Sequence, residues 1–131
     1  MARQLLDTTS LIDYSKGFEP SMAYIKHLLA SGDEVGVCPV VVAEFYAGLP
    51  PDRHQEWDSF LSSLRFWPIS YAASVQAGTW RYAFARRGVQ LAMTDSLVAA
   101  VANEVGGTVV TTNGRDFPMG VPLLNPRTWS P

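Results

Sequence analysis

The sequence predicts an α/β protein, a three-layer α/β/α sandwich built around a short and mostly parallel sheet. Short runs of β-branched and aliphatic residues alternate with longer segments of helical apolar spacing along all 131 residues. No repeat, linker or low-complexity stretch divides the chain, so we expect a single domain over residues 1–131. The predicted order is strand, two helices, strand, two helices, strand, two helices and two final strands.

The elements of the first half are marked by glycine, proline and capping residues. Asp7 ends the first strand, and the hydroxyls of residues 8–10 are expected to cap the helix that follows. Pro20 and Pro39 each suit the first turn of a helix, and Gly48 suits a helix end. The expected elements are a strand at 3–6, a helix at 8–16, a helix at 20–31, a strand at 35–38 and a helix at 39–48.

The second half continues the alternation. Pro50 and Pro51 break the chain, and Gly88 and Gly106 mark the ends of two later helices. Thr94 is a good N-cap residue for the last helix. The expected elements are a helix at 53–64, a strand at 65–69, helices at 72–87 and 94–105, and strands at 108–112 and 121–124. We expect the tail at 125–131 to be a loop.

The composition excludes several classes of protein. With 47% hydrophobic and 17% charged residues, the chain can bury a core and is not disordered. A formal net charge of −2 gives no global basic field, so nucleic-acid binding needs a local patch. One cysteine, Cys38, and two histidines supply a zinc site poorly, and Cys38 is expected to be a buried structural thiol. No segment has the length of a membrane span or the pattern of a signal peptide, which predicts a soluble, cytoplasmic protein.

Four acids are expected at one edge of the sheet. Asp7 follows the first strand, Asp95 falls in the first turn of a helix, and Asp116 comes just after a later strand. Glu44 is the only charge on an apolar helix, where it is expected to be buried and therefore paired, protonated or bound to a cation. Simple capping by Asp7 and a solvent-facing Glu44 are the alternatives. In open α/β sheets, ligands gather near strand C-termini and helix N-termini, where these acids would meet.

Convergence of the four acids would favour a bound cation. Two unit charges about 4 Å apart repel by about 4 kcal/mol at an effective dielectric near 20. Close carboxylates therefore hold protons or bind a hard divalent ion, and all-oxygen ligands favour Mg²⁺ or Mn²⁺ over Zn²⁺. Such a site suits hydrolysis of phosphodiester bonds.

The chain resembles the PIN-domain nucleases, and within them the VapC-type toxins of toxin–antitoxin operons. The matching motifs are Leu5-Leu6-Asp7-Thr8-Thr9, Val42-Ala43-Glu44, Thr94-Asp95-Ser96-Leu97-Val98-Ala99-Ala100 and Thr111-Thr112-Asn113-Gly114-Arg115-Asp116-Phe117. This resemblance implies an Mg²⁺- or Mn²⁺-dependent endoribonuclease with a PIN-like fold. Asp7, Glu44, Asp95 and Asp116 would be the catalytic and metal-binding acids, with Asp7 and Asp95 as direct ligands. Thr9, Thr111 and Asn113 would position the acids or the scissile phosphate.

The same resemblance implies partners. They are a transfer or ribosomal RNA substrate, a VapB-type antitoxin covering the acidic groove, and a second copy of the chain in a homodimer. An acidic pocket needs a basic rim to hold a polyanion, and Arg86 and Arg115 are candidates for RNA contact. A solvated helix face is the plainer interpretation of the arginines at 81 and 87.

Two other functions fit parts of the pattern. A non-catalytic RNA- or protein-binding module on the same fold would result if the acids lay too far apart to share a cation. A phosphotransfer domain would use a nucleophilic aspartate with nearby acids and a lysine. Against the phosphotransfer domain, the only lysines, Lys16 and Lys26, both precede the second strand, and no second aspartate follows Asp7 closely.

Overall fold

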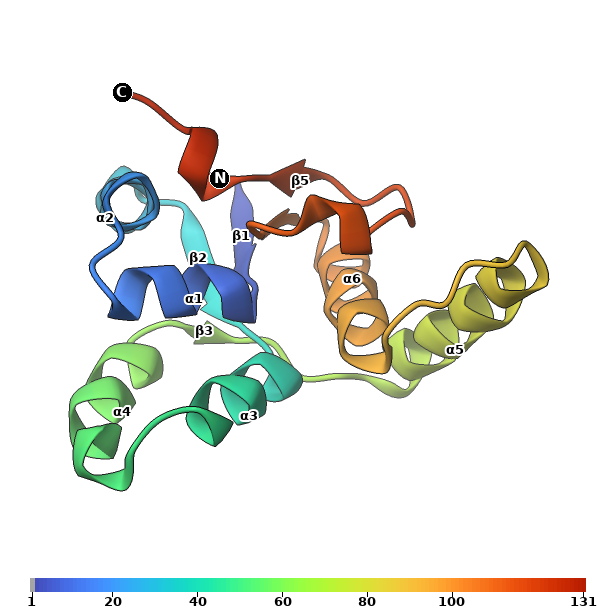
Figure 1. Ribbon diagram of the computed structural model, residues 1–131, viewed down its shortest axis with the longest axis horizontal. Coiled ribbons are helices and arrows are strands. Elements are labelled where there is room, and N and C mark those ends of the chain that lie inside the picture. Colours follow the sequence, from blue (N-terminus) through green and yellow to red (C-terminus); the bar gives the residue numbers. More distant parts are fainter. Residues whose placement is uncertain (1) are drawn as a thin grey trace.

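The computed structural model describes residues 2–131 and has the predicted order of elements (Figure 1). The strands are β1 (Arg3–Leu6), β2 (Glu34–Val37), β3 (Arg65–Phe66), β4 (Thr108–Val110) and β5 (Leu123–Leu124). The α-helices are α1 (Thr8–Ser15), α2 (Glu19–Ser31), α3 (Pro39–Ala47), α4 (His54–Ser62), α5 (Tyr71–Arg86) and α6 (Met93–Val105). Short 3-10 turns occupy η1 (Pro51–Arg53), η2 (Gly114–Asp116) and η3 (Pro126–Thr128).

The strands form one parallel sheet in the order β3-β2-β1-β4-β5, which confirms the predicted α/β class. The chain builds outward from the central β1 to β2 and β3, and then crosses to β4 on the other side of β1. The direction of winding therefore reverses between β1 and β4. In open parallel sheets, ligands bind at the carboxyl ends of the strands at such a reversal.

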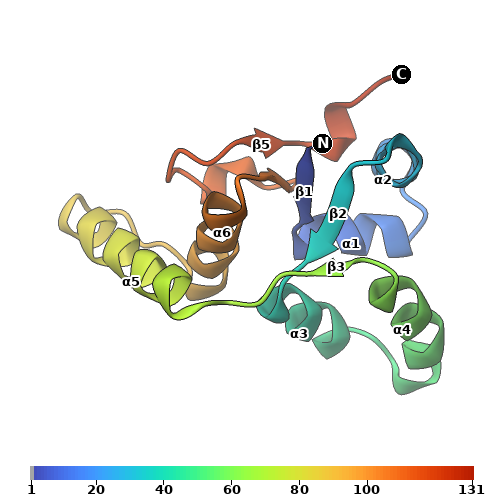
Figure 2. The same ribbon diagram turned by 180° about the vertical axis from the view of Figure 1, so that it is seen from behind.

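Helices cover the sheet on both sides of β1. Figures 1 and 2 show α1 and α2 on one side, α6 on the other, and α3 and α4 as a pair beside β3. Helix α5 packs against α6 and extends outward from it. Aliphatic side chains from β1, β4 and α6 are completely buried between these layers: Leu5, Leu6, Val98, Val101, Val109 and Val110. This core fixes the ends of β1 and β4 against the start of α6.

Local details differ from the sequence predictions at two helix starts. Helix α6 begins at Met93 with Ala92 as its N-cap, so the prediction that Thr94 is the N-cap is wrong. Asp95 nevertheless lies in the first turn, as expected. In α1, no side chain caps the helix, because the hydroxyls of residues 8–10 bond to other partners.

The C-terminal segment is more ordered than predicted. Asn125 accepts a hydrogen bond from the Arg127 amide with its side chain and so begins η3, and Pro126 is fully buried. Trp129 packs against Tyr24 and His27 of α2. The segment predicted as a loop therefore contains a short 3-10 turn that packs on α2. Within residues 2–131, no helix is both long and apolar enough to cross a bilayer.

Candidate active site at the carboxyl edge of the sheet

Asp7 is the buried centre of the candidate site. It directly follows β1, and only 4% of its surface is exposed. Thr111, the residue after β4, donates its hydroxyl to Asp7 Oδ2 at 2.9 Å, and the Thr9 hydroxyl lies 3.3 Å from the same oxygen. Burial raises the pKa of Asp7, while these two hydroxyls and the Thr8 amide act in the opposite direction. Within residues 2–131, no cationic side chain forms an ion pair with Asp7.

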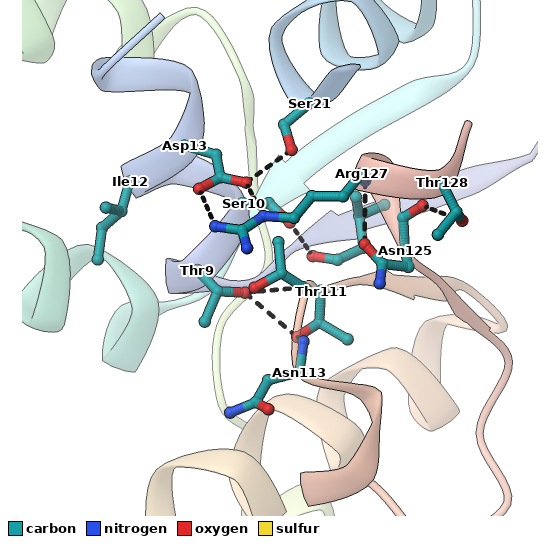
Figure 3. Close-up of polar contacts among 12 residues, drawn as sticks. Thr9, Ser10, Ile12, Asp13, Ser21, Thr111, Asn113, Asn125, Arg127 and Thr128 are labelled. Carbon is teal, nitrogen blue, oxygen red and sulfur yellow. Dashed lines mark hydrogen bonds and ion pairs between the residues drawn. The ribbon is translucent and has the colours of Figure 1, made fainter. Parts of the chain in front are cut away.

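The two threonines are themselves held by the backbone. Thr9 Oγ1 accepts the Thr112 amide at 3.0 Å and lies 3.2 Å from Thr111 Oγ1, while Thr111 Oγ1 accepts the Asn113 amide at 3.0 Å (Figure 3). Ser10 donates to the carbonyl of Val110 at 2.6 Å. Of the hydroxyls predicted to cap α1, those of Thr9 and Ser10 instead fasten the start of the helix to the end of β4 and the residues just after it. Thr9 and Thr111 therefore both contact Asp7 while they are themselves held by the backbone after β4.

Glu44 lies on an exposed face of α3, so the expectation that it is buried is wrong. Its Oε1 accepts the Thr8 hydroxyl at 2.8 Å, which links α3 to the residue after Asp7. Repulsion from Glu44 contributes to the raised pKa of Asp7. The side chain therefore points toward the site, although its helix does not bury it.

The pKa of Asp95 is raised by burial and in part by each of the other three acids. Asp95 is half-buried in the first turn of α6, and its pKa is raised to about 6. Burial is the largest cause, followed by repulsion from Asp7, Asp116 and Glu44 in that order. Because Coulomb repulsion falls with distance, one carboxyl that responds to three others lies among them.

Asp116 is placed by η2, and Asn113 holds it by donating its side-chain amide to Oδ2 at 2.6 Å. Arg115 lines a hollow of about 200 Å³ together with Asp95 and Asp116, so this candidate for RNA contact lies beside the acids. Arg86 does not line that hollow. It lies in the last turn of α5, which points away from the sheet, and its guanidinium stacks on Tyr82 (Figures 1 and 2).

The acids are close enough for their charges to repel, but within residues 2–131 they do not form a complete metal-binding site. Among residues 2–131, no three carboxylate, imidazole or thiol side chains are gathered as in a formed metal site. The acids can repel one another without forming a metal site, because like charges repel over distances longer than a metal–ligand bond. The donor set is wholly oxygen, since Cys38 is completely buried and burial raises its pKa to about 11.

A second buried aspartate anchors the C-terminal segment to α1. Asp13 is 5% exposed and accepts two hydrogen bonds from the Arg127 guanidinium, at 2.8 and 2.9 Å, and one from Ser21 at 2.7 Å (Figure 3). Arg127 also lies over the ring of Phe18. These contacts, led by the Arg127 hydrogen bonds, lower the pKa of Asp13. The helix that begins beside Asp7 is thus fixed at its other end too.

The fold and the site together define an α/β protein with an acidic site at the carboxyl edge of a parallel sheet. A family model of the PIN domain matches residues 5–119, which include all four acids. The chain belongs to the PIN-domain family.

Relatives and solved structures agree with this assignment. The chain is 29% identical over 126 residues to Ribonuclease VapC19 of Mycobacterium tuberculosis, covering 94% of this chain and 98% of that protein. A DNA-bound VapBC structure from Salmonella typhimurium contains a chain with the same fold, with a TM-score of 0.82 and 24% identity over 96% of this chain and 99% of that one. VapBC2 from Rickettsia felis, bound to a promoter DNA fragment, gives a TM-score of 0.81 and 22% identity over 98% and 99%.

Proposed function

We propose that this protein is an endoribonuclease that depends on Mg²⁺ or Mn²⁺ and acts as the toxin of a type II toxin–antitoxin pair. Membership of the PIN-domain family and similarity to a protein named a ribonuclease support the reaction class. The observation that carries the proposal is the family match over all four acids, together with the contacts that tie Asp7 to Thr111, Glu44 to Thr8 and Asp116 to Asn113. Four acids in one field at a strand edge are poised to receive a cation.

The donor set fits a hard divalent ion, because its side chains offer carboxylate oxygens and no nitrogen or sulfur. Asp7 and Asp95 would be direct ligands, with Glu44 and Asp116 completing the shell directly or through water. When bound, such an ion neutralises charge on a phosphodiester and makes water a stronger nucleophile at neutral pH.

The chain's own residues prepare the acids for this task. The hydroxyls of Thr9 and Thr111 fix Asp7, the Thr8 hydroxyl holds Glu44 at Oε1, and the Asn113 amide holds Asp116 at Oδ2. Positioned groups accelerate a reaction because little rearrangement remains to be made. Glu44 and Asp116 are exposed, so an attacking water can reach them.

The substrate is an RNA with an accessible strand, and transfer and ribosomal RNA are the expected classes. Arg115, beside Asp95 and Asp116, would contact a backbone phosphate. Arg86 lies at the outer end of α5, so it would contact RNA only at that end of the helix. Both substrate classes are present in the cytoplasm, which is where we place the activity.

The expected protein partners are a VapB-type antitoxin and a second copy of the chain. The solved structures named VapBC support the antitoxin. An exposed stripe on α5 supports the homodimer: Tyr71, Val75 and Tyr82 are 87%, 50% and 64% exposed. With Gly78 they follow the 4-3-4 spacing of a helix–helix seam. Light scattering of the wild type should give twice the mass of one chain. The Tyr82→Glu variant should give the mass of a single chain. A monomeric wild type would contradict this assignment.

Exchange of a single acid tests the proposed function. Asp95→Asn should abolish RNA cleavage in Mn²⁺ and remove any rise in melting temperature that Mn²⁺ causes, because a ligand stabilises only the state it binds. Asp52→Asn, at an exposed acid of η1, is the matched control and should behave as wild type. Full activity of Asp95→Asn would disprove the assignment. Inactivity of wild type without any metal response would favour the binding module.

A further inference from the structure

A second hollow borders the acidic site on the side away from Arg115. It lies between α1 and the end of α3 and has a volume of about 270 Å³. Figures 1 and 2 show these two helices side by side. We call it the α1–α3 pocket, and its lining residues include Ile12, Lys16, Glu44, Gly48, Leu49 and Arg53. Because Glu44 belongs to both, the pocket opens directly beside the acids.

The walls of the α1–α3 pocket combine apolar and cationic side chains. Ile12 and Leu49 supply aliphatic surface, and Figure 3 shows Ile12 directed away from the Asp13–Arg127 pair. Lys16, just after α1, and Arg53, in η1, supply two positive charges. An apolar wall with cations at its rim suits a flat heterocycle joined to phosphates, which is the chemistry of a nucleotide.

The two cations differ in their present contacts: Lys16 has no ion pair within the described residues, whereas Arg53 contacts Glu56 and lies over the Trp57 ring. Lys16 is the C-cap residue of α1, and among residues 2–131 no carboxylate lies within ion-pair distance of it. Arg53 pairs with Glu56 at 2.9 Å, but both side chains are exposed, at 44% and 62%. Exposed pairs contribute little, so the guanidinium can exchange Glu56 for a phosphate with little loss.

The size of the pocket limits what can enter. At about 270 Å³ it lies just below the roughly 300–1,000 Å³ of sites that enclose drug-sized ligands. It therefore suits a single unpaired nucleotide and not a duplex. Proteins read single-stranded RNA by taking unstacked bases into such pockets.

We propose that the α1–α3 pocket receives the unpaired base next to the scissile phosphate and so helps to determine where the RNA is cut. This inference rests on the proposed ribonuclease function. The strand would cross the acids between two hollows, one walled by Glu44 with Lys16 and Arg53, the other by Asp95 and Asp116 with Arg115. Lys16 and Arg53 would hold the phosphates that flank the base.

Filling the pocket tests this without changing a charge. Gly48 lines the pocket with a negative φ, and a Cβ built there would meet only the Phe45 carbonyl, at 3.9 Å. Gly48→Leu should therefore fold and occupy the space for the base. Ala30→Leu, at an exposed position of α2, is the matched control.

The probe is a pool of single-stranded RNA oligonucleotides of random sequence, cut in the presence of Mn²⁺ and sequenced at the new ends. Wild type and Ala30→Leu should show the same base preference beside the cut. Gly48→Leu should lose that preference and cleave roughly 5- to 100-fold less efficiently, the effect of one lost base contact. In the Asp95→Asn background, which binds without cutting, Gly48→Leu should weaken binding of the fluorescently labelled pool by a similar factor.

The outcomes separate this inference from the proposed function. If Asp95→Asn is inactive but Gly48→Leu keeps the wild-type preference and affinity, the pocket does not hold a base and the inference is wrong. If Gly48→Leu melts as wild type and loses only the preference and affinity, the inference stands. If Asp95→Asn cleaves as wild type does, the ribonuclease site is misassigned and both proposals fail.

Discussion

Helix α1 carries two buried aspartates in opposite situations. Asp7, just before the helix, and Asp13, in its second half, are 4% and 5% exposed. Asp13 is neutralised by the Arg127 guanidinium, and its pKa is lowered. Asp7 has only hydroxyl and amide donors, and its pKa is raised. The two carboxylates are about equally buried, but the charge of Asp13 is paired with a guanidinium and the charge of Asp7 is not paired with a cation within residues 2–131.

The contrast shows how the fold separates structure from chemistry. A buried carboxylate without a cation disfavours the folded state, and proteins keep such groups where function requires them. Asp13 has its counter-charge within the chain and joins α1 to the C-terminal segment. Among residues 2–131 no cationic side chain pairs with Asp7, so a cation from outside would have its largest effect there.

The largest effect expected from breaking this contrast comes from Asp7→Asn. RNA cleavage should fall by at least about 100-fold, the order of magnitude associated with losing a catalytic acid or base. Folding should not suffer, because the asparagine carbonyl still accepts the Thr111 hydroxyl and a buried charge is removed. Cleavage assays and thermal melts of the metal-free protein measure both effects. A large drop in melting temperature would show that the Asp7 charge is structural.

The same exchange at the other end of the helix should have the opposite result. Asp13→Asn removes the charge that Arg127 and Ser21 bind, and should lower the free energy of unfolding by about 1–3 kcal/mol. Arg127 is half exposed and regains water, which keeps the effect below that of a fully buried pair. Urea melts measure the change. Equal stability of Asp7→Asn and Asp13→Asn would remove the distinction drawn between the two sites.

A smaller effect appears when pH is varied. The pKa of Asp13 is lowered by folding, so the pair contributes its full stability above the unfolded-state pKa of about 3.9. That contribution is lost as pH falls through the lower, folded-state value. The difference in melting temperature between wild type and Asp13→Asn should therefore be constant from about pH 5 to 8 and shrink below about pH 4. A difference that shrinks between pH 8 and 6 would point to another group.

Much of the fold could be predicted from local signals. The order of elements followed from apolar spacing and from prolines and glycines at helix ends, such as Pro39 and Gly106. Helix α6 shows the limit, since Thr94 is the better N-cap residue but the helix begins at Met93. Packing of α6 against the sheet outweighs a capping preference of about 1 kcal/mol.

The element ends that carry the candidate acids could be predicted, but the contacts of those acids could not. Asp7, Asp95 and Asp116 each adjoin a strand or helix end, which sequence can locate. The exposed position of Glu44 and its bond to Thr8 depend on how α3 packs beside α1, and spacing along one helix does not fix this. Likewise, Arg127 contacts Asp13 across 114 residues, and nothing near Arg127 in the sequence signals that partner.

The central position of β1 has a consequence for the synthesis of the chain. Strand β1 is translated well before its neighbour β4, which follows roughly a hundred residues later, and Thr111 reaches Asp7 across 104 residues. Contacts of such long sequence separation form slowly, because a long loop must close before they are made. The nascent chain therefore carries Asp7 long before it can present the finished edge. Of the four acids, Asp7 is translated before the others, yet the Thr111 contact that positions it can form only after β4 has been made.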